Sequence, residues 1–283
     1  KICKILLVIL AIFLCVAFYE LLGICVAYKK QPEVSNTTKK ETKNGSWNEC
    51  SENTERAVII EKNPEALLQR VRLIKNAKKE IILSTFAFQS DESGKLILGA
   101  LHDAADRGVH IRLLVDGMES WIDMEGNPYF YGLSSHENVE IKLYNKANPL
   151  KPWKMMGRMH DKYLIADGKR YILGGRNTYN YFLGDFPGHK NYDRDVLVVC
   201  DEPEKENSVN QLLEYFETIW EQEDSGYFHD NKKLANRKSV KNAVLELQNG
   251  YQKYFEENKE RICDTDYTDE TFETEKIALV SNP

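Results

Sequence analysis

The distribution of apolar and polar positions divides the 283-residue chain into segments of different character. Residues 5–28 are apolar apart from Glu20, and a helix of this length, at about 1.5 Å per residue, crosses the hydrocarbon core of a bilayer. The run is longer than the apolar part of a secretion signal and lacks a small-x-small cleavage site. The pattern predicts an uncleaved transmembrane anchor in residues 1–30, followed by a polar tether in residues 31–56.

Residues 57–222 alternate between helical and strand periodicity. Asn63-Pro64-Glu65 is a typical helix start, and Gly108 ends a second helix that leads at once into a strand. Such a short helix-to-strand connection is typical of parallel sheets. The segment therefore predicts an α/β fold, in which a mixed, mostly parallel sheet is flanked by helices. The first predicted helix starts at Asn63-Pro64 and has apolar positions as far as Ile74, the second runs from Asp91 to the stop at Gly108, and the third covers 208–221. The predicted strands are 80–88, 109–116, 139–144 and one that is entered by Asp193 and Asp195 and reaches Val199.

Residues 223–283 have a different pattern. Apolar residues at helical spacing predict a charged helix over residues 232–262, and an acidic loop follows over 264–275. Lys276 then begins a strand pattern that reaches Val280. We interpret residues 223–283 as a helical connector and the start of a truncated second lobe, which would make the chain the N-terminal half of a longer protein.

The charge and the cysteine content limit the kinds of binding site that the chain is expected to have. The net charge is -6, and the residues beyond position 50 carry 31 basic against 40 acidic side chains without a basic stripe. Nucleic-acid-binding domains usually have the opposite balance, so we expect no nucleic-acid partner. Cys50, Cys200 and Cys263 are far apart in sequence, and no cysteine or histidine pair has metal-ligand spacing. We expect neither metal nor cofactor, and a disulfide among these cysteines stays open.

The candidate functional residues are concentrated in residues 159–177. His160 and Lys162 are two residues apart on a predicted strand, so their side chains point to one face. The apolar residues that follow do not alternate with polar ones, which indicates a strand buried on both faces. A histidine and a lysine that project together from a buried strand favour an anion as ligand. The turn at Gly174-Gly175 lets the backbone approach that anion, and Asn177 adds an amide donor.

The full spacing is His-x-Lys-x4-Asp-x6-Gly-Gly-x-Asn over residues 160–177, with Asp167 as its third fixed position. It resembles the motif of the phospholipase D superfamily, apart from Gly175 where many members have serine. Residues 57–222 look most like bacterial cardiolipin synthase-type members. Those sites combine two such motifs, and this chain has one. The resemblance therefore implies a second His-x-Lys lobe, supplied by a missing C-terminal half or by a homodimer partner.

The resemblance also implies roles for individual residues. His160 would be the nucleophile and form a phosphohistidine, while Lys162, Asn177 and the backbone at Gly175 would hold the phosphate. Asp167 is the third residue of the catalytic motif, and in the family it acts structurally rather than at the phosphate. A carboxylate should orient His160, and the sequence leaves Asp193 and Asp195 as alternatives for this role.

The anchor and the motif together favour a membrane-anchored phosphatidyltransferase that acts on a phospholipid such as phosphatidylglycerol, in a bacterial cell membrane. Lysines flank the anchor on both sides, so its orientation stays open. Two alternatives remain: a phosphodiesterase acting on nucleic acid, and a non-catalytic, membrane-tethered phospholipid-binding half-site. Residues 151–158, where basic and apolar side chains interleave, are either an ordinary connector or a rim that touches lipid.

Overall fold

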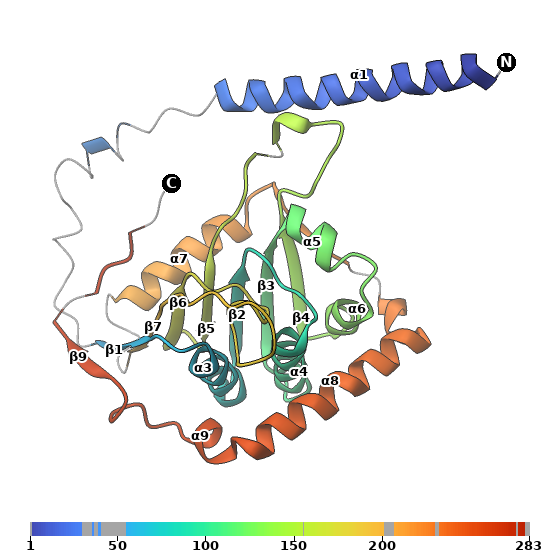
Figure 1. Cartoon of the computed structure of the whole chain (residues 1–283). Coiled ribbons are helices and arrows are strands. Elements are labelled where there is room, and N and C mark those ends of the chain that lie inside the picture. Colours follow the sequence, from blue (N-terminus) through green and yellow to red (C-terminus); the bar gives the residue numbers. More distant parts are fainter. Residues whose placement is uncertain are drawn as a thin grey trace.

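A computed structural model describes residues 2–29, 36, 39–40, 55–154, 156–200, 207–229, 232–275 and 277–280. Within these residues, helix α1 (Ile2–Lys29) lies outside a domain built around a nine-stranded sheet (Figure 1). Most of the predicted tether, including Cys50, lies outside the described residues. The strands are β1 (Glu55–Ile60), β2 (Glu80–Thr85), β3 (His110–Asp116), β4 (Val139–Tyr144), β5 (Lys162–Ala166), β6 (Arg170–Gly174), β7 (Asp195–Cys200), β8 (Ser225–Tyr227) and β9 (Phe272–Thr274).

The strand order is β8-β4-β3-β2-β5-β6-β7-β1-β9. Strands β2, β3 and β4 are parallel, whereas the other six neighbouring pairs of the described sheet are antiparallel. The α/β class and the mixed sheet are confirmed, but the expectation of a mostly parallel sheet is wrong. A parallel pair needs a crossover connection, and α4 (Glu92–Asp106) provides one between β2 and β3. Strands β5, β6 and β7 are joined by loops that contain no such helix.

Helices cover both faces of the sheet (Figure 1). One core lies between the sheet and the side carrying α3 (Asn63–Asn76) and α4, and the other lies under α7 (Ser208–Trp220). Leu164 of β5 belongs to the first core, and its neighbours Tyr163 and Ile165 belong to the second. The prediction that this strand is buried on both faces is therefore confirmed. The remaining helices are α5 (Gly117–Asp123), α6 (Pro128–Ser134), α8 (Lys238–Glu257), α9 (Lys259–Cys263), η2 (Pro152–Lys154) and η3 (Lys232–Asn236).

The described residues of the segment 223–283 pack on the same domain. Helix α8 lies against α4, where a β-carbon at Gly99 would be 2.7 Å from the Leu247 carbonyl oxygen. Strand β8 pairs with β4 at one edge of the sheet, and β9 pairs with β1 at the other. The strand predicted from Lys276 onward is not formed in residues 277–280. Ile277 and Leu279 pack instead against the core under α7, and the Leu279 N–H donates to the Gln211 side chain.

Candidate active site

Four residues of the motif lie along the side of the sheet where β2 and β6 end and β5 and β7 begin: His160, Lys162, Gly175 and Asn177. We call this side the active-site edge. The end of β2 and the beginning of β5 are neighbours, because Thr85 is paired with Lys162. The end of β6 and the beginning of β7 lie at the same edge, because Gly174 is paired with Asp195. Antiparallel pairing thus brings the two halves of the motif together. Strand β5 begins at Lys162, so His160 precedes the strand in which it was predicted.

His160 is an exposed residue whose ring contacts Phe86. The two ring centroids are 4.7 Å apart, and the planes meet at 64° in an edge-to-face arrangement. Although the residue as a whole is exposed, its neighbours remove part of the water around the ring, and this partial desolvation, reinforced by the positive charge of Lys162, lowers the pKa of the imidazole. At neutral pH the ring is therefore uncharged, and one of its nitrogens keeps a lone pair. This is the form that a nucleophile requires.

Lys162 is buried next to the histidine. Its Nζ donates a hydrogen bond of 2.6 Å to the His160 carbonyl oxygen and lies 5.3 Å from the centre of the Phe86 ring. Burial lowers the pKa of the ammonium to about 8, although Asp161 and Asp193 oppose this shift. The ammonium has three N–H donors. The carbonyl oxygen takes one of them, which leaves donors for an anion.

The side-chain oxygen of Asn177 is engaged in a hydrogen bond, which leaves the amide nitrogen as a donor. Its Oδ1 accepts the backbone N–H of Ala87 at 3.1 Å, and the side chain is buried. With the oxygen engaged, the amide group has its Nδ2 hydrogens to offer. The neighbouring Arg176 is directed into the domain, where it donates to the carbonyl oxygens of Ile60 and Glu61. Arg176 therefore has a structural role.

The structure distinguishes the two candidate aspartates. The Oδ2 atom of Asp195 is 2.9 Å from Nη1 of Arg70 and 3.2 Å from Nη1 of Arg176, and all three side chains are buried. Asp195 is thus engaged in an ion-pair cluster with α3, which argues against its predicted alternative role of orienting His160. Asp193 is only partly buried and accepts the backbone N–H of Arg194. Its charge also raises the pKa of Lys162, which places it beside the motif.

Gly175 leaves room for that aspartate. A β-carbon at position 175 would lie 2.0 Å from Oδ2 and 2.4 Å from Cγ of Asp193. Any side chain at this position would displace the carboxylate. The glycine that distinguishes this motif from the commoner serine pattern is therefore matched to the position of Asp193.

Asp167 lies at the other end of β5 from His160. Its backbone has a φ of 54°, and its carboxylate accepts the backbone N–H groups of Lys78, Lys79 and Glu80 at 2.7 to 3.1 Å. These bonds fix the connection from α3 to β2. The geometry agrees with a structural role and not with a place among the groups that touch the substrate, so its inclusion with the catalytic residues needs correction.

Two further residues lie near the motif: Asp116, which carried no predicted role, and Arg158, the last residue of the predicted 151–158 connector or rim. Asp116, buried at the end of β3, accepts the Met159 backbone N–H and is 2.7 Å from Nη2 of Arg158. The Arg158 guanidinium also lies 5.0 Å from the centre of the Phe86 ring. Asp116 therefore positions the chain directly before His160. Two features of the sequence could have identified these residues: an aspartate at the end of a buried strand, and an arginine two residues before the histidine.

Cysteines and acidic clusters add no metal site. Cys200 is buried in β7 and Cys263 is exposed, while Cys50 lies outside the described residues, so the disulfide question stays untested. Among the described residues, no group of three or more His, Cys, Asp or Glu side chains could hold a metal ion. The donors at the sheet edge are a lysine and an amide, together with the imidazole of His160.

Comparison with known proteins shows the family to which the chain belongs. The family model described as "Cardiolipin synthase, PLD-like domain" matches residues 70–220, which is more than half of the chain. The chain belongs to this phospholipase D-like family. An uncharacterized protein of Helicobacter pylori strain J99 is 30% identical over 212 residues, covering 70% of this chain and 39% of that protein. Cardiolipin synthase C of Escherichia coli K12 is 29% identical over 171 residues, covering 56% of this chain and 34% of the relative.

A solved structure supports the phospholipase D-like fold. Phosphatidylserine synthase of Haemophilus influenzae Rd KW20 superposes with a TM-score of 0.51 at 17% identity, covering 78% of this chain and 48% of that one. The chain thus spans less than half the length of these relatives. Helix α1 is long and apolar enough to cross a membrane. It is a candidate anchor for this phospholipase D-like chain.

Proposed function

We propose that this chain carries one half of the site of a membrane-anchored phosphatidyltransferase, with a phosphohistidine intermediate at His160. The observation that carries the proposal is the grouping of an uncharged imidazole with the donors of Lys162 and Asn177 at one sheet edge. Membership of the cardiolipin synthase-type family supports a phospholipid as substrate. The candidate span supports a site held at the bilayer surface.

The reaction would proceed in two displacements at phosphorus. In the first, a ring nitrogen of His160 forms a P–N bond, the P–O bond to the first alcohol breaks, and that alcohol leaves with a proton. In the second, the oxygen of an acceptor alcohol or water attacks phosphorus, loses its proton and breaks the P–N bond. Lys162 and Asn177 would stabilise the negative oxygens in both steps. Asp193 would balance the imidazolium charge and orient the ring.

The proton for the leaving alcohol needs a general acid on the other side of the phosphate. We assign this role to a second His-x-Lys lobe, either in the rest of a longer polypeptide or in a second copy of the chain. Without that lobe, the half-site would bind a phosphate and turn over poorly.

The test uses the full-length protein in vesicles that contain phosphatidylglycerol labelled with ³²P. We expect labelled cardiolipin or phosphatidic acid, and an acid-sensitive label on His160 after rapid quenching. His160→Asn should lose both. His110→Asn is the matched control, because His110 begins β3 at the opposite edge of the sheet, where it contacts Glu80 and Glu140.

Label found on another residue would refute the nucleophile assignment. Nicking of DNA by the same preparation, lost in His160→Asn, would replace the proposal with the nucleic-acid phosphodiesterase alternative. Tight binding of phosphatidylglycerol without turnover, in a protein containing both lobes, would favour the non-catalytic alternative.

A further inference from the structure

The loop over residues 145–158, which the structure describes apart from residue 155 and which we call the 145–158 loop, joins the active-site edge of the sheet to α1. It leaves β4, reaches α1 through η2, and returns toward β5 (Figure 1). The Tyr19 hydroxyl donates to the Leu150 carbonyl oxygen at 2.8 Å. A β-carbon at Gly23 would lie 2.3 Å from Cγ of Pro152, so a glycine is required for this close approach.

Hydrogen bonds give the 145–158 loop a defined shape. The Asn145 side chain donates to the carbonyl oxygens of Lys154 and Gly157, which closes the base of the loop. Lys154 also forms an ion pair of 2.7 Å with Asp224. The backbone N–H of Lys154 donates to the Lys151 carbonyl oxygen within the single turn of η2. The loop therefore projects from the domain in a defined conformation.

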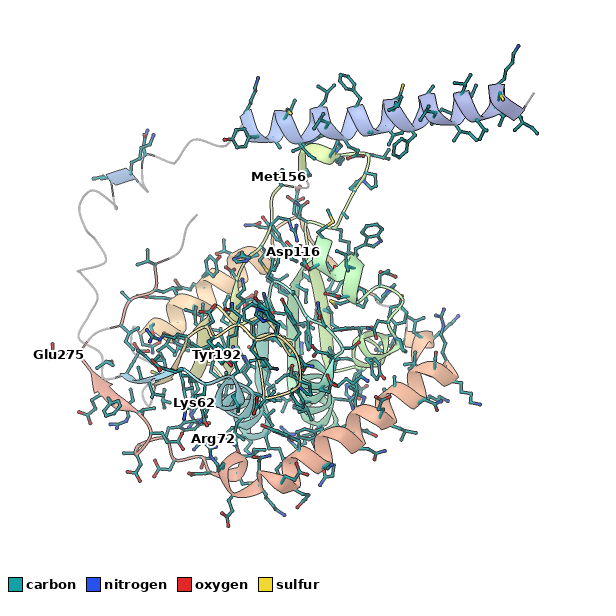
Figure 2. All side chains as sticks on the ribbon, in the orientation of Figure 1. Lys62, Arg72, Asp116, Met156, Tyr192 and Glu275 are labelled. Carbon is teal, nitrogen blue, oxygen red and sulfur yellow. The ribbon has the colours of Figure 1, made fainter. Side chains whose placement is uncertain are left out.

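The tip of this projection carries exposed apolar side chains. Leu150 is 79% exposed, Trp153 45% and Met156 54%, and Figure 2 shows Met156 between the sheet and α1. Lys151 and Lys154 are exposed beside them. Apolar residues with a tryptophan and flanking lysines are the combination that the headgroup region of a membrane favours. There the apolar side chains contact the acyl chains while the lysines contact the polar headgroups.

The contact with α1 indicates where the loop lies relative to a bilayer. A hydrocarbon core takes roughly 20 helical residues. The loop touches α1 at Tyr19 and Gly23, in the C-terminal half of this 28-residue helix. That is the part of a span that approaches the membrane surface on the side of the domain. From this contact the chain needs only seven residues to pass from Trp153 to His160.

We propose that the 145–158 loop enters the phospholipid leaflet next to α1, with Leu150 and Trp153 at the acyl boundary and Lys151 at the level of the phosphates. The loop would thereby hold the His160 edge at the leaflet surface. The statement that the leaflet supplies the substrate rests on the proposed function. The contact between the loop and lipid does not, because it requires no turnover.

The test measures the depth of Trp153 in the full chain reconstituted in phosphatidylglycerol nanodiscs. Phospholipids brominated near the headgroup end of the acyl chain should quench tryptophan fluorescence more than phospholipids brominated near the chain end. Trp153→Phe should lose most of the quenched intensity. Trp220→Phe is the comparison variant, because Trp220, the last residue of α7, is only 7% exposed and its ring packs against Phe216.

Equal quenching in the wild type and in Trp153→Phe would overturn the proposal. So would full quenching of the Trp153 signal in nanodiscs by acrylamide from the aqueous phase, because it would place the loop in water. Circular dichroism of Trp153→Phe checks that the fold is retained. Since no step depends on turnover, an inactive protein that shows the expected quenching would refute the proposed function alone.

Discussion

The carboxylate of Asp193 occupies the space in which a β-carbon of residue 175 would stand. Gly175 directly follows β6 and Asp193 precedes β7, and a β-carbon on the glycine would come within 2.0 Å of Oδ2, far below any normal contact. This proximity brings a negative charge to the edge that carries Lys162, whose pKa responds to it. The absence of a side chain at position 175 thus lets Asp193 act on the charge of Lys162 in the proposed phosphate site.

Gly175→Ala should displace Asp193 and lower phosphatidyl transfer by roughly 10-fold or more, because small displacements of an active-site group are costly. With the aspartate moved away, the pKa of Lys162 should also fall further. Steady-state assays and NMR titration of the lysine measure the two effects. Gly250→Ala is the matched control in α8, where a β-carbon meets nothing within 4 Å. Unchanged activity in Gly175→Ala would contradict this account.

The two aspartates should separate into a stability effect and an activity effect. Asp195→Asn breaks a buried pairing with Arg70 and Arg176, and we expect a loss of about 3–5 kcal/mol in the free energy of unfolding. Asp193→Asn should change that free energy by less than about 0.5 kcal/mol, yet strongly reduce turnover. Urea unfolding and activity assays test both. The reverse assignment of effects would show that Asp195 serves His160.

Activity should follow a bell-shaped pH profile. The pKa of His160 is lowered from its usual value, so its neutral, nucleophilic form is lost only on acidification below the usual histidine range. The pKa of Lys162 is about 8, so the cation that binds phosphate is present below that pH and is lost above it. Affinity for inorganic phosphate, measured by calorimetry, should fall as the pH rises through about 8. Lys162→Arg, which stays charged, should remove this alkaline fall if it binds phosphate.

Lys162→Met should lose phosphate affinity without losing stability. The lowered pKa means that the folded protein binds this proton less readily than the unfolded chain, so the buried ammonium opposes folding below its usual pKa. Removing the charge should leave the midpoint of thermal unfolding equal or higher at pH 7. A lower midpoint would indicate that the 2.6 Å bond to the His160 carbonyl oxygen outweighs the cost of burial.

Asp167→Ala should act on stability alone. Three backbone N–H groups lose their acceptor, and alanine tolerates the φ of 54° poorly, so we expect a loss of about 1–3 kcal/mol. Turnover per folded molecule should be retained. Denaturant titration provides the measurement, with the exposed Asp269→Ala as control. Loss of turnover in fully folded Asp167→Ala protein would return this residue to the catalytic group.

The helices and the spacing of the motif could be predicted from the sequence. The starts at Pro64 and Asp91 depend on local chemistry, and both helices form where predicted, with Asp91 accepting the Gly94 backbone N–H. The strand after Lys276 was mispredicted because strand formation depends on an available partner, and Ile277 and Leu279 find the core under α7 instead. The same limit applies to strand direction, which depends on how β5, β6 and β7 are connected in space.

The sequence by itself determined the apolar helix, the α/β alternation and the family motif, because these depend on residue type and spacing along one segment. Only the tertiary structure shows that Asp195 is paired with Arg70 of α3, more than 120 positions away in the chain, which supports the proposal of Asp193 for orienting His160. It also brought the 145–158 loop against Gly23 and placed Phe86 beside His160. Contacts between distant segments depend on packing and charge pairing in three dimensions, and a linear pattern does not contain them.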